Sequence, residues 1–171
     1  MRLTCAAAAV IFVLSFGMNS APSFATPPGN LQGSWRVTVR PTLPISVCNG
    51  PVIAPAPAPF LELANYGAGG VMNETNAQLN LVSAGVSPGF PFNASDGYGA
   101  WKADDGHIAV KFSKLLFDVT GNYAGEADLI EDLNVSGDTL SGAFTIKFNF
   151  LNNSPSLCSG GTVTATRVAA Q

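Results

Sequence analysis

An acidic residue interrupts one of the most regular apolar patterns in the sequence. Glu131 shares the parity of four apolar residues of the same segment, Ala127, Leu129, Leu133 and Val135. In an uninterrupted β-strand this parity points the carboxylate into the apolar interior, where burial raises its pKa and suits it to act as an acid, a base or a ligand anchor. A bulge or a strand end at Ile130 would return the side chain to water instead. We expect this second arrangement, because it is the more common one.

A second candidate for chemistry is the serine within residues 85–89. Gly85-Val86-Ser87-Pro88-Gly89 matches the G-x-S-x-G pattern of hydrolases, in which the residue after the serine gives its backbone N–H to the oxyanion hole. Pro88 has no N–H to give. The only histidine of the chain, His107, lies in a predicted hairpin turn, where we expect a solvated side chain. We therefore predict no catalytic triad.

Metal and cofactor chemistry has little support in the sequence. Zinc sites use three or four Cys, His or carboxylate ligands, whereas this chain has three cysteines and one histidine. The acidic pairs Asp104-Asp105 and Glu131-Asp132 lack EF-hand spacing, and neither glycine-rich nucleotide-binding motif is present. Eight Lys and Arg against eleven Asp and Glu do not favour binding to phosphate backbones. We expect no metal, no cofactor and no nucleic-acid partner.

The first 25 residues have the three parts of a secretory signal peptide. Arg2 supplies a positive start, residues 5–17 form an apolar run, and Ser23-Phe24-Ala25 puts small residues at the cleavage site. A membrane-spanning helix needs about 20 apolar residues, and no stretch of the chain reaches that length without charges or turn residues. We therefore expect one domain over residues 26–171 with no membrane span, secreted or periplasmic after cleavage.

Removal of this leader leaves two cysteines, Cys48 and Cys158. An even pair in an exported chain predicts a disulfide, because the compartment beyond the membrane is oxidising. The chain-entropy account assigns about 4.7 kcal/mol to a bridge that closes a loop of roughly this size. A redox-active pair would more often be close in sequence. We expect a structural disulfide between the first loop and the approach of the last strand.

The rest of the chain alternates β-patterned segments with glycine-rich turns. Apolar and polar residues alternate from Trp35 to Arg40, which predicts a first strand. Residues 140–151 give the clearest pattern, with one face formed by Leu140, Phe144, Ile146, Phe148 and Phe150. The turn Ser136-Gly137-Asp138 joins this segment to residues 127–135. Further strands are predicted at residues 60–66, 71–76, 98–103, 108–117 and 162–169.

Seven or eight short antiparallel strands predict an all-β fold, either a closed barrel or a β-sandwich. We prefer the barrel because closure removes exposed sheet edges, and the Thr-rich last segment can pair with the first. Two segments interrupt the strands. Residues 51–59 repeat proline and favour a stiff, extended connector. Residues 83–96 form a long loop with Phe90 and Phe92, whose rings either cover a barrel end as packing, which we expect, or form a lid over a cavity.

Leu31-Gln32-Gly33-Ser34-Trp35 at the first strand resembles the G-x-W signature of lipocalins and other calycin barrels. The resemblance implies that Trp35 closes the barrel floor and that Arg167, near the chain end, stacks across its ring. Taken with Cys48, Ser87-Pro88-Gly89, Gly99-Ala100-Trp101 and Cys158, the sequence is also similar to a group of small exported bacterial proteins with no known activity.

Such a barrel favours three functions. The first is binding of a small apolar molecule, because an eight-stranded barrel is just wide enough to hold one. Phe144 and Phe148 would line its cavity, Tyr98, Trp101 or the loop phenylalanines its mouth, and Glu131 would be the polar anchor. The second is an isomerase or cyclase similar to allene oxide cyclase, with Glu131 and Tyr123 as its reactive groups. The third is an interaction or inhibitor module with a fully packed core. The sequence does not indicate an oligomeric state.

Overall fold

The computed structural model describes residues 31–77, 92–104 and 107–169. The predicted signal peptide, Ser87 and Phe90 lie outside these residues. Within them no helix is long and apolar enough to cross a membrane. The described chain consists of strands and turns, and its elements are β1 (Gly33–Val47), β2 (Val52–Ala54), β3 (Phe60–Tyr66), β4 (Val71–Asn76), β5 (Asn93–Ala94), β6 (Gly97–Asp104), β7 (His107–Phe117), β8 (Tyr123–Ser136), β9 (Thr139–Phe150) and β10 (Leu157–Arg167).

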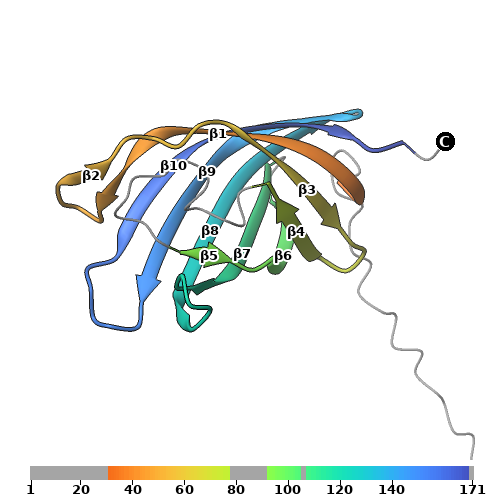
Figure 1. The fold of residues 1–171 in the computed structure, drawn as a ribbon. Helices are drawn as coiled ribbons and strands as arrows, with labels where there is room; N and C mark the ends of the chain where they lie inside the picture. Colours follow the sequence, from red (N-terminus) through yellow and green to blue (C-terminus); the bar gives the residue numbers. More distant parts are fainter. Residues whose placement is uncertain (1–30, 78–91, 105–106, 170–171) are drawn as a thin grey trace, which may run out of the picture.

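The strands form a closed antiparallel barrel. Eight of the described strands follow one another around the ring in chain order, from β1 through β3, β4, β6, β7, β8 and β9 to β10. Strand β10 pairs with β1, from Trp35 opposite Arg167 to Val47 opposite Leu157, and so closes the ring. The two short strands lie outside the ring, with β2 paired to β1 and β5 paired to β7 (Figure 1). The barrel prediction is confirmed, and the sandwich is excluded.

Alternation of side chains explains why these segments become strands with one buried face. In β7 every second residue from Ile108 to Leu116 is buried, while the residues between them are exposed or half-buried. Strand β9 buries Leu140, Phe144 and Phe148 on the same principle. Every segment predicted as a strand from this periodicity forms one, with ends within a few residues except where β1 and β10 extend further.

Strand β1 is much longer than its alternating segment, because the strand continues past a bend at which the alternation is interrupted. Its register against β10 shifts between Pro41 and Leu43 and again between Leu43 and Ser46, and Pro41 cannot donate to the ladder. Gly161 faces this bend, where a Cβ would lie 2.1 Å from the Arg40 carbonyl oxygen. Only glycine permits that approach. The bend carries the second half of β1 away from β3, toward β2.

Trp35 and Arg167 lie together at one end of the barrel, its floor. Trp35 is fully buried, and its indole Nε1 donates a hydrogen bond to the Leu31 carbonyl at 2.8 Å. The Arg167 guanidinium carbon lies 4.3 Å from the centre of the Trp35 ring, within the range of a cation–π contact. Arg167 Nε also donates to Asp138 Oδ1 at 2.9 Å. The predicted stacking of Arg167 on Trp35 is confirmed.

The predicted disulfide is also confirmed. Cys48 and Cys158 are bonded, with 5.0 Å between their Cα atoms, and the bridge joins residues 110 positions apart in sequence. It ties the turn after β1 to the start of β10, next to the Ser46 and Cys158 pair of the ladder. A structural disulfide is consistent with an oxidising compartment.

The two interrupting segments each contribute to one barrel end. Residues 51–59 are not purely a connector, since Val52–Ala54 forms β2 beside Ile45 and Ser46. In the described part of the loop at 83–96, the Phe92 ring stacks on Phe150 with 5.0 Å between ring centres. Phe92 therefore packs against the barrel end, as expected for the packing alternative.

Candidate functional site

The interior of the barrel contains two apolar clusters. One includes the floor residue Trp35 and reaches up to Val39 and Phe144. The other lies toward the disulfide end and includes Ile45, Leu116, Ala127, Phe148 and Leu157. Leu129 and Ile146 pack against both clusters and so connect them.

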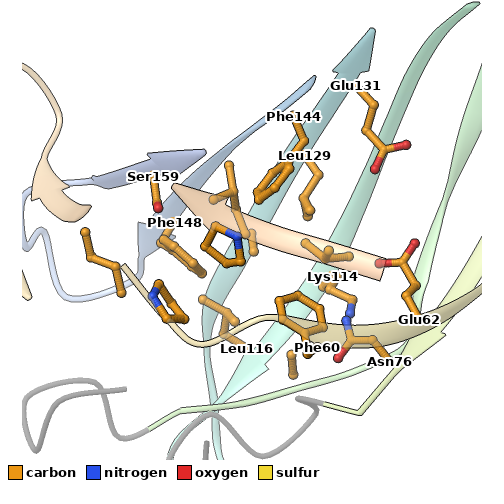
Figure 2. Close-up of a pocket in the computed structure, with 17 residues that line it drawn as sticks. Phe60, Glu62, Asn76, Lys114, Leu116, Leu129, Glu131, Phe144, Phe148 and Ser159 are labelled. Atoms are coloured by element: carbon orange, nitrogen blue, oxygen red, sulfur yellow. The ribbon is translucent and has the colours of Figure 1, made fainter. Parts of the chain in front are cut away.

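A cavity of about 90 Å³ lies where the two clusters meet (Figure 2). Its wall is mostly apolar and includes Val39, Ile45, Phe60, Leu116, Leu129, Phe144, Ile146 and Phe148. A smaller set of polar side chains lines it as well, namely Glu62, Asn76, Lys114, Glu131 and Ser159. An apolar cavity with a few convergent polar groups is the usual form of a small-molecule site.

Strand alternation directs the charged side chains inward. Glu62 lies on the same face of β3 as Phe60, Ala64 and Tyr66, so it points into the barrel although it is acidic. Lys114 occupies the corresponding position in β7, between the inward Phe112 and Leu116. Among the described residues, four charged side chains are at most 5% exposed, and they are Glu62, Glu74, Lys114 and Glu131.

The expectation that Glu131 returns to water is wrong. Strand β8 continues through this position, with Ile130 opposite Lys111 and Glu131 opposite Val110 in an unshifted register. Ile130 is 55% exposed, whereas Glu131 is 5% exposed. The irregularity of the β7–β8 ladder lies instead between Leu116 and Phe117. Because the pleat is unbroken at residue 131, the carboxyl group points into the cavity.

Lys114, the one buried lysine among the described residues, forms an ion pair with Glu74, one of three buried glutamates. Lys114 Nζ lies 2.6 Å from Glu74 Oε1, and both side chains are buried. Burial raises the pKa of Glu74, and the charge and hydrogen bond of Lys114 oppose that rise. Gly97 makes room for this pair, since a Cβ there would lie 2.5 Å from Glu74 Oε1. The ion pair is therefore built into the β4–β6–β7 wall.

Glu131 lies in an environment that favours its protonated form. Burial, with a contribution from the negative charge of Glu74, raises the pKa of Glu131 to about 7. The hydroxyl of Tyr66, which projects from β3 on the opposite wall, donates a hydrogen bond to this carboxylate and partly offsets the rise. Burial likewise raises the pKa of Tyr66 well above its ordinary value. Near neutral pH, Glu131 can both give and take a proton.

Glu62 is the least compensated of the interior charges. Burial raises its pKa well above the ordinary range, the charges of Glu74 and Glu131 add to the rise, and Lys114 opposes it. Within the described residues its carboxyl group has neither an ion pair nor a hydrogen bond. Figure 2 shows Glu62 and Glu131 on the same side of the cavity, away from Phe148. Two carboxyl groups thus lie at the polar end of an apolar cavity, which Lys114 and Asn76 line as well.

The structure brings together three of the residues predicted to bind a ligand and separates two. Glu131, Phe144 and Phe148 line the same cavity. Tyr98 and Trp101 do not line it. Tyr98 has the outward parity of β6 and is 66% exposed, while the Trp101 indole donates a hydrogen bond to the Gly67 carbonyl at 3.1 Å and packs in the floor cluster. The prediction that either residue forms the mouth is wrong.

The predicted partnership of Glu131 with Tyr123 is also wrong. Tyr123 is 42% exposed, and its hydroxyl donates a hydrogen bond to Glu126 at 3.0 Å. The interior tyrosine that contacts Glu131 is Tyr66. His107, expected to be solvated, lies at the surface 3.2 Å from Asp132.

Of the interior polar residues, only Glu131 was identified as a candidate in the sequence analysis. Glu62, Tyr66, Glu74 and Lys114 were not identified. For Lys114 the alternating pattern does indicate an inward-facing side chain, because the residue shares the parity of Ile108, Val110, Phe112 and Leu116. For Glu62 the pattern misleads, since its neighbours Leu61 and Leu63 are the residues that face outward.

Comparison with known proteins adds nothing to this description: no protein-family profile, curated protein or solved structure matches the chain. Among the described residues, no group of three or more His, Cys, Asp or Glu side chains is arranged to hold a metal ion, although three glutamates share the interior. The chemistry of the site therefore follows from its carboxyl groups and its apolar wall.

Removing the interior lysine tests the ion pair. We expect Lys114→Met to lower the free energy of unfolding by about 3 to 5 kcal/mol, because it leaves Glu74 buried without a counter-charge. The double variant Glu74→Gln, Lys114→Met should recover much of this loss, as urea denaturation would measure. The control Lys111→Met removes an exposed lysine from the same strand and should change stability by no more than about 0.5 kcal/mol. Equal stabilities for the two lysine variants would contradict the buried pair.

The raised carboxyl pKa values predict a protein that loses stability as pH rises from 5 to 8. In the unfolded chain Glu131 ionises near its ordinary pKa of 4.5, but in the folded protein it ionises near 7. Between these values the unfolded state releases its proton first, so the free energy of unfolding falls by about 3 kcal/mol for this group alone and levels off above pH 7. Thermal unfolding should show the slope in the wild type and a smaller slope in Glu131→Gln. A melting temperature that rises over this range would refute the assignment.

Proposed function

We propose that the protein is an exported, lipocalin-like β-barrel that binds a small, largely apolar molecule, with the carboxyl groups of Glu62 and Glu131 as its polar anchors. The observation that carries the proposal is the meeting of two carboxyl groups, each 5% exposed, at one end of an apolar cavity. Burial of polar groups costs free energy unless a partner compensates it. A ligand with a polar head and an apolar body supplies that partner.

The cavity favours binding over a purely structural core. The interior of an eight-stranded barrel is either filled by side chains or holds one small ligand. Here Phe60, Phe144 and Phe148 line a space rather than close it. An interaction module that acts only through its outer loops would have no need of charged side chains in this interior.

The size of the cavity bounds the ligand. At about 90 Å³ it is smaller than the roughly 150 Å³ of a cavity known to hold benzene, and well below the roughly 300 to 1,000 Å³ of a drug-sized site. A cavity of this size accommodates a short-chain molecule, or the end of a longer one. Because Ile45, Pro57 and Ala94 also line the space, such a longer ligand would leave between β1, β5 and the segment after β2.

Export is supported by two features. The disulfide between Cys48 and Cys158 suits an oxidising compartment, and residues 1–25 have the composition of a cleaved leader. On this proposal the protein acts in the periplasm or outside the cell, where a binding barrel would meet its ligand in solution or at a membrane surface.

Filling the cavity tests the proposal. A thermal-shift screen of short aliphatic and aromatic compounds should find molecules that stabilise the wild type, by about 2.7 kcal/mol when the free ligand is at 100 times its Kd. Phe148→Trp adds bulk to the wall and should remain folded while losing this response. The control Leu63→Trp places the same ring on the outer face, where Leu63 is 53% exposed, and should respond as the wild type does. A wild type that no compound stabilises would count against binding.

A further inference from the structure

The interior charges identify the kind of head group that the cavity accepts. In the described part of the chain, three carboxyl groups and one ammonium group are buried in the barrel, and the ammonium group of Lys114 lies 2.6 Å from Glu74. The two carboxyl groups left over, those of Glu62 and Glu131, both line the cavity, together with Asn76 and the paired Lys114. A ligand carboxylate would bring a fourth acid into this space with no available cation, which is strongly unfavourable in a low-dielectric interior.

Each of these carboxyl groups also has an aromatic ring beside it. Phe144 is the direct cross-strand neighbour of Glu131, and Phe60 lies two residues before Glu62 on the same inward face of β3. All four residues line the cavity. Aromatic faces attract cations, and they do so most strongly where water is excluded. Carboxyl groups next to aromatic rings form a site for an organic cation.

We propose that the ligand of this cavity is a small apolar amine, bound as its ammonium ion at the Glu62 and Glu131 end with its carbon chain along Ile146 and Phe148. This inference rests on the proposed binding function and names the class of ligand. Glu62, which has no ion pair or hydrogen bond within the described residues, gains from the ammonium ion the partner that it lacks in the free protein.

Binding of this kind releases a proton. In the free protein burial and the nearby Glu74 raise the pKa values of Glu62 and Glu131, that of Glu131 to about 7, and so favour their protonated forms. The ammonium ion binds the carboxylate form, so one carboxyl group loses its proton to water as the N–H···O contact forms. The other groups facing this site are Lys114, which is paired with Glu74, and the hydroxyl of Tyr66. Amine affinity therefore rises with pH between 5 and 8.

Three matched probes test the inference on the full mature chain. Isothermal titration with n-butylamine, 1-butanol and butyrate at pH 7.5 compares a cation, a neutral molecule and an anion of nearly the same shape. We expect n-butylamine to bind at least tenfold more tightly than 1-butanol, and butyrate not to bind. Titration of the wild type at pH 6 in buffers of different ionisation enthalpy should show release of close to one proton for each amine bound, and amine affinity should be tenfold or more weaker at pH 5 than at pH 7.5.

Variants separate the carboxyl groups from the apolar wall. Glu62→Gln and Glu131→Gln should each weaken n-butylamine binding by tenfold or more while leaving 1-butanol binding within about twofold, which also shows that the barrel is folded. The control Glu126→Gln removes an exposed carboxylate of β8 and should leave all three affinities unchanged.

The outcomes distinguish the two proposals. Equal binding of n-butylamine and 1-butanol, or amine binding without proton release, would overturn the amine inference and leave the binding function standing. Tighter binding of butyrate would also overturn it, because the acid would then have displaced Glu74 from Lys114. If none of the three probes binds to the wild type, both the amine inference and the proposed binding function fail.

Discussion

Among the described residues, one ammonium group, that of Lys114, is buried with three carboxyl groups inside a closed apolar barrel. The chemistry of the cavity follows from this excess of acidic groups. Lys114 is paired with Glu74, which leaves Glu62 and Glu131 without an ion-pair partner among the described residues. A buried unpaired charge is costly, so burial raises the pKa values of both groups and favours their protonated forms in the free protein. On the proposed function the same cost favours a ligand that supplies positive charge, because that charge allows one of the two groups to ionise.

The interior carboxyl groups are buried because the barrel is closed. Pairing of β10 with β1 removes the sheet edges and encloses the inward faces of all eight ring strands. The floor is closed by Trp35 under Arg167, the opposite end is tied by the disulfide, and Glu62 and Glu131 between them are each 5% exposed. Gly97 lets the Glu74 and Lys114 pair lie against the wall. The cavity is the space that remains where the floor cluster and the upper apolar cluster meet.

The strands that form this site were easier to predict from the sequence than the polar side chains inside it. Alternation located β8 and β9 and their aromatic face, and the same pattern raised the possibility that Glu131 points inward. The bulge that would have turned it outward is absent at that position. Glu62 was not predictable from local pattern, because Leu61 and Leu63 suggest the opposite face for the core and only pairing with β1 and β4 fixes the true one. Tyr98 and Trp101 were assigned to the mouth although their parities differ.

Direct measurement of the interior carboxyl groups tests the account most sharply. Carbon-13 NMR of protein labelled at the glutamate side-chain carboxyl carbons follows each group through its own titration. The account predicts one resonance that titrates near pH 7 and disappears in Glu131→Gln, and a second raised well above the ordinary value that disappears in Glu62→Gln. If instead every glutamate titrates near the ordinary value of 4.5, burial does not raise the pKa of the interior carboxyl groups and the account is contradicted.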